Sequence, residues 1–245
     1  MKFSLQSKYI GDIPILEVTI DRLQNKTLPT IIFYHGWQMT KKLVLTQGRR
    51  LAAKGFRVVL PDSKHHGERY QAMSPVPSLT FWQTIQANLF EFEFIVKYYQ
   101  KRQLILNDRL GVGGISMGGM TTAALLTHYS EIKVAACIMG TPDLLAYRNY
   151  LQQALKDYDR FVPSDYSHLL SWVPHYNLAT QPEKLDERPL FIWHGRQDER
   201  VPFEPVEHFV KNNPQLNLTF LPAEAPHFVD LSVMDEVADF FGNYL

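Results

Sequence analysis

Residues 111–126, GVGGISMGGMTTAALL, place one serine among several glycines, between an apolar run and a stretch of helix-forming residues. Gly114, Ser116 and Gly118 match the pattern G-x-S-x-G. In this pattern the serine lies on a tight turn from a strand into a helix, and side chains two positions away would clash. The free N–H groups of the following helix favour negative charge at the turn. The stretch therefore predicts a nucleophilic Ser116, with a purely structural glycine turn as the alternative.

A serine hydroxyl becomes a strong nucleophile only beside a base, and the base needs a carboxylate to orient it. If the acid and then the histidine follow the serine along the chain, both should come from loops after later strands. His227, in PAEAPHF, follows the last predicted strand, and Asp198, in HGRQDERVP, follows the predicted strand before it. We therefore expect Ser116, His227 and Asp198 to form a catalytic triad. Asp143, just after the strand that ends in IMG, is the alternative acid.

The oxyanion of an acyl-transfer reaction needs at least two preorganised N–H donors. The backbone N–H of Met117, the residue after the serine, is one candidate. The backbone N–H of Trp37, in the loop HGWQ after an apolar strand, is the other. Two further histidines have structural interpretations: His35 is expected to fix this loop by a hydrogen bond, and His194 to be a packed residue at a strand end.

The run PDSKHHGER places Asp62, His65, His66 and Glu68 close together in the chain, which suggests a metal site. Adjacent histidines rarely face the same ion, however, and no third group lies in register with them. We therefore predict that the chain binds no metal here and that this loop lines the substrate pocket.

The elements that must position these groups can be predicted from hydrophobic patterns. Residues 3–10 and 13–20 alternate apolar and polar residues, which predicts an antiparallel pair at the edge of a sheet. Residues 30–36 and 56–62 are short continuous apolar runs, a pattern typical of strands buried on both faces. Further strands are predicted at 108–116, 133–140, 188–195 and 216–222. Helical spacing predicts helices at 43–55, 79–102, 117–130, 203–213 and 233–244.

This alternation of strands and helices predicts an α/β fold with a mostly parallel sheet and helices on both faces. Ligands bind such sheets at the carboxyl ends of the strands. Residues 141–185 interrupt the alternation, since they show helical spacing and many aromatic residues but no strand pattern. We expect a single domain over residues 1–245 with a helical cap inserted at about 141–185, because the insertion is too short to bury a core of its own.

Composition excludes several classes of protein. Lysine plus arginine and aspartate plus glutamate each number 25 among the 245 residues, so no broad positive field attracts nucleic acid. No apolar run is long enough to cross a membrane, and the N-terminal residues lack the apolar core of a signal peptide. The one cysteine, Cys137, lies in an apolar strand and fits a reducing compartment. These features predict a soluble, cytoplasmic protein, and they carry no signal for an oligomeric state.

Taken together, the motifs resemble those of the α/β-hydrolases. The residues that carry the resemblance are HGW at 35–37, GFRVVLPDSKHHGER at 55–69, GISMGG at 114–119, HGRQDERVP at 194–202 and PHF at 226–228. Within that superfamily the chain is similar to small bacterial esterases related to dienelactone hydrolases and to the catalytic domain of prolyl oligopeptidases. The resemblance implies a central sheet of about eight strands, a Ser-Asp-His triad and no cofactor.

The expected reaction is hydrolysis of a small-molecule carboxylic ester through an acyl-enzyme, with small or short acyl groups favoured because the cap narrows the cleft. A thioesterase, or a hydrolase of small peptides or amides, with the same triad is the alternative. A binding protein that has lost the chemistry is a further one. Aromatic residues of the cap are candidates for an apolar wall of the pocket: Tyr147, Tyr150, Phe161, Tyr166 and Trp172.

Overall fold

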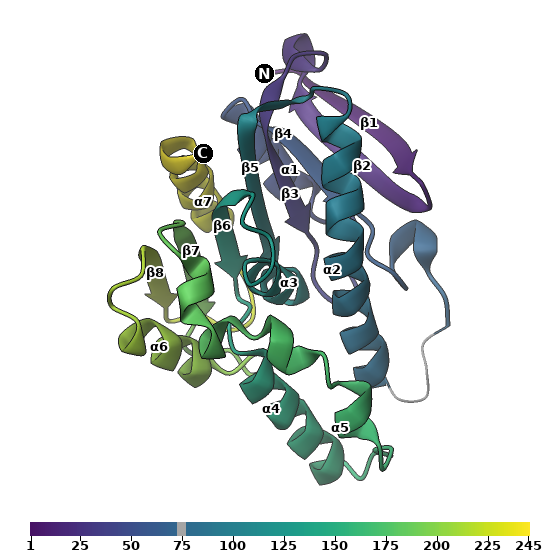
Figure 1. Ribbon diagram of the computed structural model, residues 1–245, viewed down its shortest axis with the longest axis vertical. Coiled ribbons are helices and arrows are strands. Elements are labelled where there is room, and N and C mark those ends of the chain that lie inside the picture. Colours follow the sequence, from purple (N-terminus) through teal and green to yellow (C-terminus); the bar gives the residue numbers. More distant parts are fainter. Residues whose placement is uncertain (73–76) are drawn as a thin grey trace.

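The described residues, 1–72 and 77–245 of the computed structural model, form one sheet of eight strands flanked by helices (Figure 1). The strands are β1 (Phe3–Ile10), β2 (Ile13–Ile20), β3 (Leu28–Tyr34), β4 (Arg57–Pro61), β5 (Ile105–Ile115), β6 (Ile132–Ile138), β7 (Leu190–Gly195) and β8 (Leu218–Ala223). The α-helices are α1 (Leu45–Ala53), α2 (Pro77–Gln100), α3 (Met117–Leu125), α4 (Leu144–Asp157), α5 (Tyr166–Leu169), α6 (Phe203–Asn212) and α7 (Leu231–Tyr244).

The strands follow the order β1-β2-β4-β3-β5-β6-β7-β8 across the sheet. The β2 strand runs antiparallel to both of its neighbours, β1 and β4, and every pairing from β4 to β8 is parallel. The prediction of a mostly parallel sheet with an antiparallel pair at its edge is confirmed. The parallel pairing brings the carboxyl ends of β3, β5, β7 and β8 to one edge of the sheet, where ligands bind in folds of this kind.

The first two strands share an alternating sequence but not the same environment. In β1, residues 5–9 alternate between exposed and partly buried positions, whereas every residue of β2 is buried. Glu17 of β2 accepts hydrogen bonds from the Lys8 ammonium at 3.0 Å and the Tyr99 hydroxyl at 2.7 Å. The polar position in β2 therefore marks an internal contact with a helix on one face of the sheet, and not a side that faces solvent.

Helices cover both faces of the sheet and divide the apolar core into two clusters. On one face α2, α3 and α6 bury residues such as Trp82, Met120 and Phe209. On the other face α1 and α7 bury Leu51 and Phe241. Figure 1 shows α2 running along the front of the sheet. Because both faces are covered, β3 and β4 are buried along their whole length, as their apolar runs predicted.

The helix boundaries lie close to those predicted. Gly55 takes a left-handed backbone, with a φ of 97°, directly after the C-cap residue Lys54, and so ends α1 where expected. The long helix predicted at 79–102 is α2. None of the helices in the described part of the chain is long and apolar enough to cross a membrane.

Between β6 and β7, residues 141–185 form α4, α5 and three short 3-10 helices and contain no strand, as their pattern predicted. This range is called the helical segment below. In Figure 1, α4 and α5 lie beyond the ends of the central strands. The ring of Trp82 in α2 lies 6.1 Å from the rings of both Tyr147 and Trp172, so aromatic contacts join the helical segment to α2.

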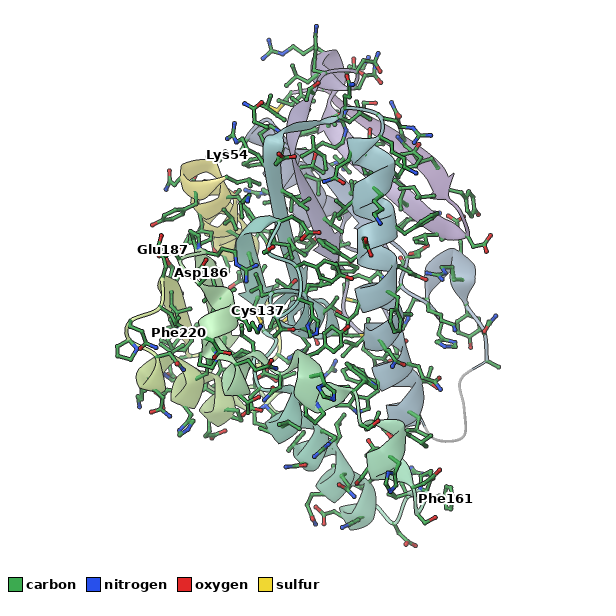
Figure 2. The ribbon with its side chains drawn as sticks, in the orientation of Figure 1. Lys54, Cys137, Phe161, Asp186, Glu187 and Phe220 are labelled. Atoms are coloured by element: carbon green, nitrogen blue, oxygen red, sulfur yellow. The ribbon has the colours of Figure 1, made fainter. Side chains whose placement is uncertain are left out.

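Cys137 of β6 is buried in the interior, as its apolar neighbours predicted (Figure 2). Burial raises the pKa of its thiol to about 12. The thiolate, and not the thiol, is the reactive form of cysteine. Cys137 is therefore a core residue with little thiolate character.

Candidate active site

Ser116 lies on a tight turn at the carboxyl end of β5, directly before α3. Its backbone has a φ of 55° and a ψ of −116°, and its N–H donates to the carbonyl of Ile138 at 2.8 Å. A Cβ atom on Gly118 would lie 2.2 Å from the carbonyl oxygen of Tyr34, and one on Gly114 would lie 2.5 Å from the Gly118 backbone. Glycine is therefore required on both sides of the serine, and the left-handed serine is a strained residue held by its surroundings.

The structure brings the three residues of the predicted triad into one hydrogen-bonded network, called the triad network below. Nε2 of His227 lies 2.9 Å from the Ser116 hydroxyl oxygen, and Nδ1 lies 2.6 Å from Oδ2 of Asp198. The tautomer that satisfies both contacts has Nδ1–H donating to Asp198 and the serine O–H donating to Nε2. The Asp198 side chain is fully buried, whereas 11% of the His227 side chain is exposed. This arrangement can transfer a proton from the serine to the histidine.

Asp198 is fixed by the loop after β7. Its Oδ1 accepts the backbone N–H groups of Arg200 and Val201, each at 2.9 Å, which leaves Oδ2 for His227. Burial alone would raise the pKa of Asp198, but hydrogen bonds from His194, His227 and the Val201 N–H hold it well below its usual range. Asp198 therefore stays ionised beside the imidazole and also orders its own loop.

Asp143, the alternative acid, has a different position in the structure. It is the N-cap of α4, and its Oδ1 accepts the N–H of Ala146 at 2.9 Å. An N-cap aspartate satisfies a free backbone donor of the first helical turn. The carboxylate that contacts His227 is Asp198, so Asp143 stabilises the start of the helical segment instead.

Close backbone packing places the His227 loop against the Asp198 loop. A Cβ atom on Gly195, the last residue of β7, would lie 2.2 Å from the carbonyl oxygen of Ala225. That carbonyl also accepts the N–H of Gln197 at 3.1 Å. Since only glycine permits this approach, Gly195 sets the separation of the two loops that carry Asp198 and His227.

His194 is a buried strand-end residue, as predicted, and it also contacts the triad network. Its two ring nitrogens lie 3.0 Å and 2.8 Å from the carbonyl oxygens of Gly140 and Val201. Its Nε2 is also 3.4 Å from Oδ2 of Asp198. This contact was not predicted, although the four-residue spacing of His194 and Asp198 around the turn after β7 is a signal for it.

The loop after β3, residues 35–41 and called the Trp37 loop below, lies beside the serine. A Cβ atom on Gly36 would lie 3.4 Å from the Ser116 Cβ, so the two backbones are close neighbours. As predicted, His35 fixes this loop: its Nε2 accepts the N–H of Ser63 at 3.1 Å. Met117 is the first residue of α3, where a backbone N–H has no acceptor within the helix. The N–H groups of Trp37 and Met117 thus belong to segments that meet at Ser116.

Residues 62–68, called the His66 loop below, do not line the cavity at the serine, so this prediction is wrong. They pack behind the Trp37 loop instead, since Gln38 donates its N–H to Nε2 of His66 at 3.0 Å. Asp62 and Glu68 pair with the buried ammonium of Lys41. Within residues 1–72 and 77–245, no group of three or more histidine, cysteine or acidic residues could hold a metal ion.

A cavity of about 670 Å³ opens beside Ser116 and His227. This volume is in the range of small-molecule sites. One wall is formed by one face of α4 together with Tyr158, the residue after the helix. The residues on this face of α4 are Tyr147, Leu151, Ala154 and Leu155. The remaining lining comes chiefly from the Trp37 loop, from Phe81 and from residues 227–229. The cavity is therefore mainly apolar, with the serine and histidine at one side.

Only one of the five aromatic residues predicted to form the apolar wall lines this cavity, namely Tyr147. Tyr166 is buried within the helical segment, and Trp172 packs on α2. The Tyr150 hydroxyl donates to the carbonyl of Glu199 at 2.9 Å. Phe161 is 73% exposed at the outer tip of the helical segment (Figure 2). Aliphatic residues of α4, which the sequence analysis did not single out, form most of this wall.

Comparisons with known proteins give a family match and two relatives. The family model described as the prolyl oligopeptidase family matches residues 50–217. YitV of Bacillus subtilis (strain 168), whose name places it among the esterases, is 32% identical over an alignment of 260 positions, which covers 98% of this chain and 99% of YitV. Esterase YjfP of Escherichia coli (strain K12) is 28% identical over 198 residues, or 81% of this chain and 80% of YjfP.

Solved structures share the fold. TT1662 from Thermus thermophilus has a TM-score of 0.77 at 17% identity, covering 99% of this chain and 98% of that one. Pyrococcus furiosus esterase Pf2001 has a TM-score of 0.68 at 20% identity, covering 99% and 93%. The mostly parallel sheet with helices on both faces is accordingly the α/β-hydrolase fold.

Proposed function

The chain belongs to the prolyl oligopeptidase family and is a hydrolase of the α/β-hydrolase fold, and we propose that it is a serine carboxylesterase. In this proposal Ser116 is the nucleophile, His227 the general base and Asp198 the acid that orients it. The observation that carries the proposal is the unbroken hydrogen-bonded triad network, with contacts of 2.9 Å and 2.6 Å, at the side of a cavity large enough for a small-molecule ester.

Acylation would begin with proton transfer from the Ser116 hydroxyl to Nε2 of His227 as the serine oxygen bonds to the acyl carbon. The carbonyl electron pair moves onto the carbonyl oxygen, where the N–H groups of Trp37 and Met117 stabilise the negative charge. When the tetrahedral intermediate collapses, the bond from the acyl carbon to the alcohol oxygen breaks. His227 then gives its proton to that oxygen, and the alcohol leaves.

Deacylation repeats these steps with water in place of the alcohol. His227 takes a proton from the water as its oxygen bonds to the acyl carbon, and it returns that proton to the Ser116 oxygen as the acid leaves. Asp198 stabilises the imidazolium in both halves of the reaction without being protonated. Its depressed pKa supports this role, because the carboxylate stays ionised at the pH where esters are hydrolysed.

We further propose that residues 1–245 act as one domain and that the helical segment is the cap of this site. The α4 face that lines the cavity supports the second statement. We also propose that the enzyme prefers esters with small or short acyl groups. A series of p-nitrophenyl esters with increasing acyl length tests it, since a short-chain enzyme loses kcat/KM as the acyl group grows.

A thioesterase is the second candidate, because of the charges at the cavity. Arg160 and Arg200 contribute to the described lining, and no aspartate or glutamate does. Positive side chains at a cavity attract anionic substrates such as the phosphates of an acyl-CoA. Equal kcat/KM values for a short acyl-CoA and for the p-nitrophenyl ester of the same acid would favour this candidate over the esterase.

The direct test compares wild type with Ser116→Ala on a short p-nitrophenyl ester. We expect wild type to hydrolyse it and Ser116→Ala to lose at least about a thousandfold in kcat, because the nucleophile is gone. Labelling with a fluorophosphonate should add the mass of the probe to Ser116 in the wild-type protein alone. Equal, slow hydrolysis by both proteins and no label on Ser116 would show that the chain is not a serine esterase.

A further inference from the structure

The sequence run PDSKHHGER is the motif that the proposed function leaves unexplained. We propose that the His66 loop positions the Trp37 loop for oxyanion binding, with His66, which accepts the N–H of Gln38 next to Trp37, as the main positioning residue. This inference rests on the proposed function, because the Trp37 N–H has a catalytic role only if an oxyanion forms at Ser116. It assigns a role to a run of histidines and acidic residues that resembles a metal site in sequence.

Three hydrogen bonds of one kind join the two loops. In each, a side chain of one loop accepts a backbone N–H of the other. His35 accepts from Ser63 at 3.1 Å, His66 accepts from Gln38 at 3.0 Å, and Oδ1 of Asp62 accepts from Lys41 at 2.8 Å. The Trp37 loop is therefore held at its first residue, its middle and its last residue.

The middle contact lies directly beside the proposed oxyanion donor. Gln38, the residue after Trp37, has a left-handed φ of 58°, which residues other than glycine seldom adopt. The hydrogen bond from its N–H to His66 holds this unfavourable conformation. The ring of His66 also packs against the Trp37 indole with a centroid separation of 4.9 Å. His66 thus fixes both the backbone and the side chain of the segment that carries the Trp37 N–H.

The protonation of His66 suits the role of an acceptor. Its Nδ1 lies 2.9 Å from the carbonyl oxygen of Lys64, so Nδ1 carries the hydrogen and Nε2 presents its lone pair to Gln38. Burial lowers the pKa of His66, and it lowers the pKa of His35 to about 4. Both imidazoles therefore remain neutral acceptors under ordinary conditions.

A buried ion pair anchors the far end of the two loops. The side chains of Lys41 and Asp62 are each 1% exposed, and the ammonium lies 2.5 Å from Oδ2 of Asp62 and 2.6 Å from Glu68. A Cβ atom on Gly67 would lie 2.2 Å from the Asp62 carboxylate, so the loop folds directly over the pair. The Glu68 carboxylate also accepts the Tyr9 hydroxyl at 2.6 Å, which ties the loop to β1. Such a pair resists deformation, because an unpaired buried charge is strongly unfavourable.

A displaced oxyanion donor affects the transition state more than the bound ester, since negative charge develops on the oxygen only during reaction. Loss of the His66 contact should therefore lower kcat and leave KM nearly unchanged. If His66 had only a structural role, its loss would change the stability of the protein but would not lower kcat selectively while KM stayed the same.

The experiment compares three variants with wild type on a short p-nitrophenyl ester. His66→Leu keeps side-chain bulk against Trp37 but cannot accept a hydrogen bond. His66→Gln keeps an acceptor oxygen. His65→Asn changes the neighbouring histidine, whose φ of 66° asparagine tolerates. If His66→Leu does not fold, His66→Ala takes its place.

We expect kcat to fall about tenfold to a hundredfold in His66→Leu, with KM within about twofold of wild type. His66→Gln should recover at least half of that loss on a logarithmic scale, and His65→Asn should stay within about twofold of wild type. Urea unfolding midpoints confirm that the proteins compared are folded. These results together would support the positioning role.

The inference is overturned if wild type is active and folded His66→Leu keeps the wild-type kcat. It is equally overturned if His66→Leu and His66→Gln lose the same activity, because then the acceptor is not what matters. An inactive wild type without a fluorophosphonate label would remove the proposed function, and this inference with it. The wild-type measurement therefore separates the two failures.

Discussion

Two polar networks are buried in the same sheet, and they differ in what surrounds them. The triad network lies at the carboxyl edge of the sheet. The second, called the Glu17 network, joins β1, β2, β4 and α2 and consists of Lys8, Glu17, Arg57 and Tyr99. In the triad network Ser116 and His227 face a cavity of about 670 Å³. In the Glu17 network the fully buried Arg57 donates to backbone carbonyls, and no member of the network lines that cavity.

This difference separates polar groups that hold the fold from those that are available for chemistry. Glu17 receives the Lys8 ammonium and the Tyr99 hydroxyl, and it lies 3.5 Å from Nε of Arg57. These contacts are all made inside the protein, away from the cavity. The Ser116 hydroxyl, by contrast, has one hydrogen-bond partner among the described residues, His227, and it lines the cavity where a substrate can enter. Burial and polarity alone therefore do not mark a functional site in this molecule; an accessible, incompletely partnered atom does.

The largest expected effect comes from breaking the triad network at its acid. Asp198→Asn should lower kcat by about a thousandfold to ten-thousandfold, because the amide no longer holds the reactive tautomer of His227 or stabilises its charged form. Ester hydrolysis by purified, folded protein measures this effect. Asp143→Asn is the matched control, since that residue caps α4, and it should retain activity within about threefold. A larger loss in Asp143→Asn than in Asp198→Asn would reverse the assignment of the acid.

The second effect comes from breaking the Glu17 network and concerns stability. Glu17→Gln leaves the buried Arg57 guanidinium without a counter-charge, so the free energy of unfolding should fall by about 3–5 kcal/mol. The kcat of the protein that remains folded should be unchanged. Urea unfolding and ester hydrolysis measure the two quantities separately. Tyr99→Phe, which removes one hydrogen bond, should lower the free energy of unfolding by only about 1 kcal/mol. A fall in kcat without a loss of stability would contradict the comparison.

The smallest effect is a dependence of stability on acidic pH that arises at Asp198. Its pKa is depressed in the folded protein, whereas an aspartate in an unfolded chain has a pKa of about 3.9. As the pH falls below about 4, the unfolded chain binds the proton first, so the stabilising contribution of the Asp198 carboxylate is lost. The free energy of unfolding should thus fall less steeply below about pH 4 in Asp198→Asn than in wild type. Urea unfolding at several acidic pH values measures the slopes, and equal slopes would contradict this account.

The groups at the carboxyl edge could be predicted from sequence because each has a local signal. The glycines around Ser116 exclude side chains from a tight turn, and Asp198 and His227 directly follow recognisable strands. Parallel strands bring such positions together whatever the detailed packing. The sheet class and most element boundaries could be predicted for the same reason.

Features that depend on packing between distant segments could not be predicted in this way. The partner of Asp62 is Lys41, which lies 21 residues earlier in another loop. Because this partner is not part of the run PDSKHHGER, the acidic residues and histidines of the run resemble a metal site in sequence. The cavity wall depends on which face α4 turns inward, and this face presents Leu151 and Leu155 where aromatic residues had been expected. Glu17 resembles a solvent-facing residue until the contacts of β2 are known.

The buried thiol of Cys137 has a consequence for redox chemistry. A sulfur atom enclosed in the core, with a pKa of about 12, offers almost no thiolate to peroxide or disulfide reagents. It is also the one cysteine of the chain, so no disulfide can form within a molecule. Hydrolysis by the folded protein should therefore proceed at the same rate in oxidising and reducing buffers.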